Sequence, residues 1–198
     1  MPIYGASQAG AVLRYRIAPS SPHDPHAMAR VYRALVPGGE SEFAVGASAR
    51  PLSAVPVRVV AEVRATDGPA GVELGPAAFA YTEIPPIDLP AGFSLEAYGG
   101  AGYVAGEAAT AFVDGQVVAM REMYEAPPAT IGAPRVSVGA GAWGGAQEDA
   151  GRLDVGPSVR VDLEIADVPA RLSIDYRRKV AGDAAPRSGL TATLSTRF

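Results

Sequence analysis

Residues 153–165 read LDVGPSVRVDLEI, and apolar side chains alternate along this segment with polar or charged ones. One face carries Leu, Val and Ile side chains, whereas the other carries Asp, Ser, Arg and Glu. Such alternation is typical of a β-strand, because successive side chains point to opposite faces of the strand. Pro157 lies on the apolar face and counts against a fully regular ladder there. The segment predicts a β-strand with one apolar and one charged face.

The same alternation recurs along most of the chain. Turn formers such as Pro37-Gly38-Gly39, Asp67-Gly68-Pro69 and Pro127-Pro128 separate the alternating segments. Several segments approach ~10 residues, which is the length of a tilted membrane strand rather than the usual 5–6. The sequence therefore predicts an all-β, antiparallel, up-and-down meander. About eleven strands are expected, at residues 9–17, 27–36, 42–50, 57–64, 72–82, 93–103, 111–122, 135–146, 153–165, 170–177 and 190–198.

The composition excludes several classes of protein. Of 198 residues, 48% are hydrophobic, which argues against a disordered chain even though Gly 23 and Pro 18 are numerous. The net charge of -4 and the lack of a basic block argue against nucleic-acid binding. Because the chain has no Cys, a disulfide framework and a thiolate zinc site are excluded.

A meander of this kind can close in two ways. A soluble β-barrel or β-sandwich hides its apolar face, whereas a transmembrane β-barrel turns that face to lipid and encloses the polar one. The small residues of segment 139–142, the single lysine (Lys179) and the alternating last segment favour the membrane form. The low aromatic content of 7% favours the soluble form. We predict one transmembrane-type barrel domain over residues 1–198, alone or as the C-terminal part of a longer protein, with about 12 strands (10–12) of ~10 residues each.

The last nine residues, LTATLSTRF at 190–198, alternate and end on an aromatic residue. This segment resembles the C-terminal signal of Gram-negative outer-membrane β-barrels, which the barrel-assembly machinery recognises. The resemblance implies an assembly signal that includes Leu194 and Phe198, a location in the cell outer membrane, and the lipid bilayer and assembly machinery as partners. More loosely, the chain is similar to the C-terminal barrels of outer-membrane proteins for phage adsorption or exopolysaccharide secretion, which implies a polysaccharide or phage partner.

The function expected from this resemblance is not enzymatic. We predict a pore or transport conduit, or the membrane anchor of a secretion or adsorption protein. The alternative is a soluble β-barrel or β-sandwich that binds a ligand in its cavity. We expect no catalytic, cofactor-binding or metal-binding residues.

Bacterial barrels have even strand numbers, whereas about eleven segments are visible here. The difference has three explanations. A strand precedes residue 1, one weak segment forms no strand, or one weak segment forms two strands. Asp114-Gly115 is a hairpin-type dipeptide that would divide segment 111–122 in this last case.

Three local patterns resemble catalytic or binding sites, but each has a simpler structural explanation. The segment SSPHDPH at 20–26 holds Ser21, His23 and His26, but its prolines predict a connecting loop with solvated side chains. The run GAGAWGG at 139–145 lacks the lysine of a phosphate-binding loop and fits a tightly curved strand. Asp162 and Glu164 have a spacing compatible with paired catalytic carboxylates, but the arginines around them favour an ion-pair ladder.

The polar faces of residues 160–165 and 170–177 carry three positive and three negative charges. If the apolar faces contact lipid, these six side chains face the lumen. We expect cross-strand ion pairs that narrow or block the lumen, because opposite charges on neighbouring strands attract. The predicted lumen-lining residues are Arg160, Asp162, Glu164, Arg171, Asp175 and Arg177.

Overall fold

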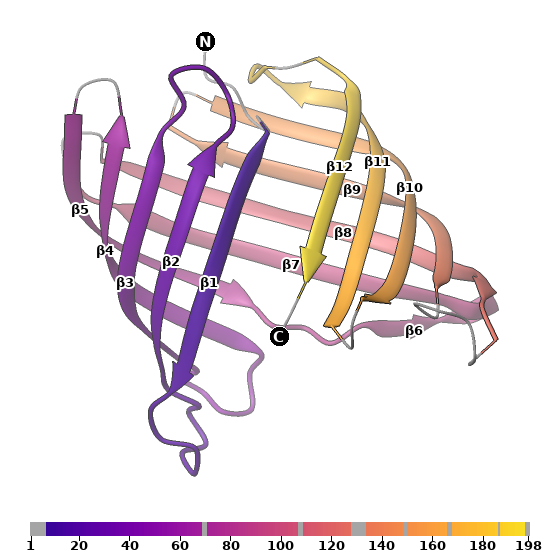
Figure 1. The fold of residues 1–198 in the computed structure, drawn as a ribbon, viewed down its shortest axis with the longest axis horizontal. Helices are drawn as coiled ribbons and strands as arrows, with labels where there is room; N and C mark the ends of the chain where they lie inside the picture. The colour runs from indigo at the N-terminus through magenta and orange to yellow at the C-terminus, as the bar shows by residue number, and fades with distance from the viewer. Residues whose placement is uncertain are drawn as a thin grey trace. The chain divides into compact units, whose positions relative to one another are not determined.

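The computed structural model describes residues 7–68, 71–106, 109–127, 134–148, 150–165, 168–185 and 187–196. Most of these residues lie in β-strands (Figure 1). Across the described ranges, no helix is both long enough and apolar enough to cross a membrane. The elements are β1 (Gln8–Arg16), β2 (His26–Ala34), β3 (Ser41–Ala49), β4 (Val57–Gly68), β5 (Gly71–Thr82), β6 (Ile87–Leu89), the 3₁₀ turn η1 (Pro90–Gly92), β7 (Phe93–Val104), β8 (Thr110–Glu125), β9 (Arg135–Gln147), β10 (Ala150–Ile165), β11 (Val168–Gly182) and β12 (Gly189–Thr196).

The strands form one 12-stranded sheet in which chain neighbours are also sheet neighbours. Its order is β1-β2-β3-β4-β5-β7-β8-β9-β10-β11-β12, with β6 paired to β7 beside this path. The prediction of an all-β antiparallel meander is confirmed. β1 and β12 are the two ends of this order and are not paired with each other among the described residues, so the sheet is not closed into a barrel.

The twelfth strand is β6, which the sequence did not reveal. β5 pairs with β7 from Ala77↔Val104 to Tyr81↔Gly100, and β6 pairs with β7 from Ile87↔Leu95 to Leu89↔Phe93. The register shifts by one residue between these two ladders. Pro85 and Pro86 separate β5 from β6, because proline has no N–H to donate to a ladder. The proposed division at Asp114-Gly115 is wrong, since β8 continues through both residues.

The chain divides into two compact units, which are described separately. The first unit holds Met1–Ile84, Tyr98–Asp114 and Ala146–Ala150, and therefore β1 to β5 and residues 98–104 of β7. The second unit holds Pro85–Ala97, Gly115–Gly145 and Gly151–Phe198, and therefore β6, residues 93–97 of β7, most of β8 and β9, and β10 to β12.

Burial in the first unit is the reverse of that in a soluble protein. On β4, Arg58, Val60 and Glu62 are 2%, 1% and 4% exposed, whereas Val59 and Val63 are 43% and 52% exposed. The strand therefore buries its charged face and exposes its valine face. β3 repeats the pattern, with Ala44 and Ser48 buried and Phe43 and Val45 exposed.

The second unit has the same reversed pattern. On β10, Asp154, Ser158 and Arg160 are buried, whereas Val155 and Val159 are exposed. On β11, Asp175 is buried between the exposed Ile174 and Tyr176. A small apolar group formed by Val118, Met120 and Trp143 is also buried.

The glycine-rich run lies within β9, as the strand interpretation expects. At Gly139 a Cβ would collide with the carbonyl oxygen of Ala119 and with Met120. At Gly141 it would meet the ring of Trp143 at 2.7 Å. These glycines therefore let β9 approach its neighbours and leave room for Trp143.

Candidate functional site

The six predicted lumen-lining residues lie on two paired strands of the second unit. Arg160, Asp162 and Glu164 are on β10, and Arg171, Asp175 and Arg177 are on β11. Asp162 stands directly opposite Arg171 in the ladder, and Arg171 Nε donates to Asp162 Oδ1 at 2.6 Å. Arg160 and Asp175 are buried, and Asp162, Arg171 and Arg177 are half-buried. Glu164 differs from the others, because its side chain is exposed.

Asp175 is held by groups on both strands. Its Oδ1 accepts a hydrogen bond of 2.7 Å from Ser158 Oγ on β10, and its Oδ2 lies 3.0 Å from Arg177 on its own strand. The Arg177 guanidinium also lies 4.6 Å from the centroid of the Trp143 ring. This cation–π contact connects the ion pairs to the buried apolar group of the second unit.

Glu96 on β7 is the important residue that the sequence analysis missed. Its Oε1 accepts a hydrogen bond of 2.7 Å from Arg160 and another of 3.3 Å from Arg171. In the sheet order β7 is three places from β10, which corresponds to about 14 Å in a flat sheet. Strand side chains stand roughly perpendicular to their sheet, so a direct ion pair over this separation indicates that the second unit curves with its polar face on the concave side. We call Glu96, Arg160, Arg171 and Asp162 the Glu96 bridge.

The sequence indicates the face on which Glu96 lies but not the residues that it contacts. Glu96 interrupts an apolar segment, FSLEAY at 93–98, and alternation places it opposite Leu95 and Ala97. A pattern along one strand gives the face of a side chain but not its partner three strands away.

The first unit contains a second set of ion pairs, built around one buried carboxylate, which the sequence pattern did not reveal. Arg30 Nη2 lies 2.6 Å from Glu42 and 2.7 Å from Glu62, and Arg64 Nε lies 2.6 Å from Glu62. The Glu62 side chain is completely buried. These four residues, the first-unit ion cluster, connect β2, β3 and β4 across their polar face.

The connection between β1 and β2 is folded onto the buried Arg58. Arg58 donates to Asp24 Oδ2 at 2.6 Å and to Glu83 Oε1 at 2.9 Å, and Arg50 also bonds Glu83. His26 lies beside them, with Nδ1 3.1 Å from Arg58 NH1. Asp24 has a φ of 43°, an uncommon value for a residue other than glycine. We call these five residues the Arg58 group.

The carboxylates of the Arg58 group have lowered pKa values. Burial raises the pKa of Glu83, but hydrogen bonds from Arg58 and Arg50 lower it by more, so that it lies below its ordinary value. Burial likewise raises the pKa of Asp24, and the hydrogen bond from Arg58 with the charges of His26 and Arg16 lowers it below its ordinary value. Both groups are therefore held in the ionised form.

Residues 20–25 of the segment SSPHDPH form a loop, as its prolines predicted, and His26 begins β2. The prediction that these side chains are solvated holds for His23 but not for Asp24 and His26. His23 is exposed and its Nδ1 lies 2.9 Å from the Arg50 carbonyl, whereas His26 is half-buried. Ser21 Oγ accepts from the backbone N–H of His23 rather than from a histidine ring. No group of three His, Asp or Glu residues in the described part of the chain has a geometry suited to a metal ion.

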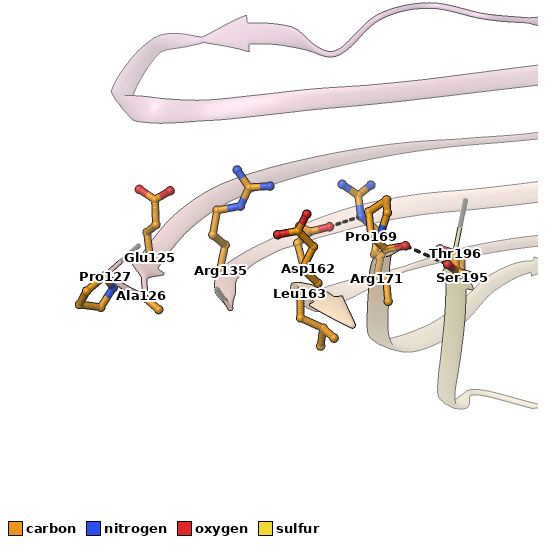
Figure 2. Close-up of a pocket in the computed structure, with 12 residues that line it drawn as sticks. Glu125, Ala126, Pro127, Arg135, Asp162, Leu163, Pro169, Arg171, Ser195 and Thr196 are labelled. Atoms are coloured by element: carbon orange, nitrogen blue, oxygen red, sulfur yellow. Dashed lines mark hydrogen bonds and ion pairs between the residues drawn. The ribbon is translucent and has the colours of Figure 1, made fainter. Parts of the chain in front are cut away.

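A polar pocket of about 1020 Å³ lies in the second unit beside the Glu96 bridge. Figure 2 shows Asp162 and Arg171 joined within it, with Glu125 and Arg135 along the same side. The exposed Glu164 also lines it. The pocket therefore presents both signs of charge beside the half-buried Asp162–Arg171 pair.

Comparisons with known proteins give no relative. No family model, curated protein or solved structure matches this chain. The two faces of the sheet and the ion pairs on its polar face are therefore the features that bear on function. Of the predicted assembly signal, Leu194 is 72% exposed on β12, and Phe198 lies outside the described residues.

Proposed function

We propose that this chain is a non-enzymatic outer-membrane β-barrel whose apolar face contacts lipid and whose ion-paired face lines the interior. The observation that carries the proposal is the reversed burial in both units. Charged side chains such as Arg58, Glu62 and Asp154 are at most 4% exposed, whereas Leu74 is 69% exposed. This distribution is the one that a bilayer favours, because lipid replaces water around the outer face.

The soluble alternative conflicts with the same observation. Soluble monomers rarely expose large continuous apolar patches, and burying charges in place of leucine and valine brings a desolvation cost without a hydrophobic gain. A ligand-binding barrel or sandwich would bury Val59, Val63 and Leu74 and expose Arg58 and Glu62. The opposite arrangement supports the membrane proposal.

The interior of the proposed barrel is crowded. The Glu96 bridge spans the concave face of the second unit, and Trp143 with Met120 and Val118 is buried there. The first-unit ion cluster occupies the polar face of the other unit. We therefore favour a membrane anchor or a narrow conduit over a wide aqueous pore. Closure would join the ends of the meander, β1 and β12, when the protein enters a membrane.

Folding into lipid tests this proposal. The chain is unfolded in urea and diluted into plain buffer, into detergent micelles and into phospholipid vesicles. We expect strand-rich circular dichroism, faster migration of the unheated protein on gels and co-flotation with vesicles only when lipid or detergent is present. A monodisperse, folded protein in plain buffer would contradict the proposal and favour the soluble module.

A further inference from the structure

Four arginines of β10 and β11 are each paired with a carboxylate, and one of these carboxylates comes from another strand. Three of the partners lie on β10 or β11 themselves, where the ladder fixes them. Glu96 alone comes from β7. The pairs are Arg152–Asp154, Arg171–Asp162, Arg177–Asp175 and Arg160–Glu96.

The Glu96 carboxylate lies between two guanidinium groups. Arg160 approaches it at 2.7 Å and Arg171 at 3.3 Å. Arg160 is only 9% exposed, and its Nε has no hydrogen-bond partner in the described part of the structure. The two arginines therefore form a preformed anion site that Glu96 occupies and that retains an unused donor.

The strand that carries Glu96 has a weak attachment on one side. β6 contributes only three ladder pairs to this part of β7, and the turn η1 between them places Ala91 at a φ of 62°. This conformation is unfavourable for alanine, so the hairpin that presents Glu96 holds local strain. Displacement of Glu96 breaks few backbone hydrogen bonds on that side.

We propose that Glu96 is a tethered anion that closes a passage for small monovalent anions, and that Arg160 and Arg171 bind the permeating anion when Glu96 moves away. This inference rests on the proposed membrane function. With Glu96 gone, Arg171 keeps Asp162 as its partner, whereas Arg160 is left without a carboxylate. The constriction gains one positive charge and selects anions over cations.

The test compares wild-type protein with Glu96→Gln in planar lipid bilayers under a KCl gradient. Glu96→Gln keeps the shape of the side chain and removes its charge. We expect a higher conductance and about a tenfold shift of the permeability ratio toward Cl⁻, which corresponds to about 1.4 kcal/mol. Glu148→Gln is the matched control, because it removes one negative charge from an exposed turn. It should leave both quantities unchanged.

The double variant Glu96→Gln/Arg160→Gln covers the case in which the single variant fails to fold, because it leaves no unpaired buried charge. It should conduct more than wild type without the preference for Cl⁻. Wild-type conductance and selectivity in folded Glu96→Gln would overturn the inference. Failure of both variants to fold would also overturn it, since Glu96 would then be a structural residue. Failure of the wild-type protein to enter membranes would instead refute the proposed function.

Discussion

Substitution of an exposed valine by arginine distinguishes a protein embedded in a membrane from a soluble one. Val63 lies near the middle of β4 and is 52% exposed, whereas Val72 lies at the start of β5 and is 69% exposed. Val72 pairs with Asp67, which lies four residues after Val63 on β4. Val72 and Val63 are therefore about 13 Å apart along the strand direction. With a tilt of ~40°, this becomes about 10 Å along the membrane normal.

Val63→Arg should therefore destabilise the protein by about 2–4 kcal/mol, and Val72→Arg by about 0–1 kcal/mol. The first substitution puts a charge near the middle of the bilayer, and the second puts it near the headgroups. The assay is reversible urea unfolding in phospholipid vesicles, followed by the fluorescence of the single tryptophan, Trp143. In a soluble protein both sites would be solvated, and both changes would stay within about 0.5 kcal/mol. That second result would refute the assignment of the valine face to lipid.

Three further substitutions and conditions test other parts of the account. Glu62→Leu should cost about 3 kcal/mol in the same unfolding assay, because it removes the fully buried carboxylate that binds the half-buried Arg30 and Arg64. A change below about 0.5 kcal/mol would show that the first-unit ion cluster is not structural. The pKa values of Asp24 and Glu83 in the folded protein lie below their ordinary values of 3.8 and 4.5. Both carboxylates therefore contribute fully to the free energy of unfolding above the ordinary pKa values, and this contribution is lost as the pH falls through the lowered pKa values of the folded protein. Unfolding free energies measured from pH 6 to pH 3 should therefore decline below about pH 4.5, and less steeply in Asp24→Asn; equal slopes would contradict the role of this loop. The natural chain has no cysteine, so pairs of cysteines can be introduced, with Leu13→Cys on β1 and a second cysteine at successive positions of β12, including Leu194→Cys. If the sheet closes in a membrane, oxidation in vesicles should form an intramolecular disulfide in at least one of these variants. Its absence at every β12 position would argue against closure.

Alternation predicted the strands well because it depends only on neighbouring side chains. β10 was expected at 153–165 and spans Ala150–Ile165. β11 was expected to end at 177 but continues to Gly182, because Arg178 places a charge on the exposed face and interrupts the alternation. The register against β10 shifts further along, where Leu153 pairs with Ala181 and Asp154 with Lys179. β6 was missed because three residues between two proline-containing segments are too short to show a period.

The ion pairs could be predicted from the sequence only where the ladder brings their residues together. Asp162 and Arg171 lie on strands joined by a short connection, so alternation alone suggests their contact. Glu96 and Arg160 are 64 positions apart, and their pairing depends on the curvature of the sheet. The ion pair between Asp24 and Arg58 depends on the conformation of the loop that carries Asp24. The prolines predict that this segment is irregular, but not which side chain it contacts.

The most direct test of the central claim is the environment of successive side chains on β4. Spin labels attached to single cysteines at Val59, Val60, Ala61 and Val63 in vesicles report collisions with oxygen, which concentrates in lipid, and with a water-soluble nickel complex. If the valine face contacts lipid, Val59, Ala61 and Val63 have high oxygen and low nickel accessibility, and the buried Val60 has low values of both. High nickel accessibility at Val59, Ala61 and Val63 would contradict it, because the valine face would then be in contact with water.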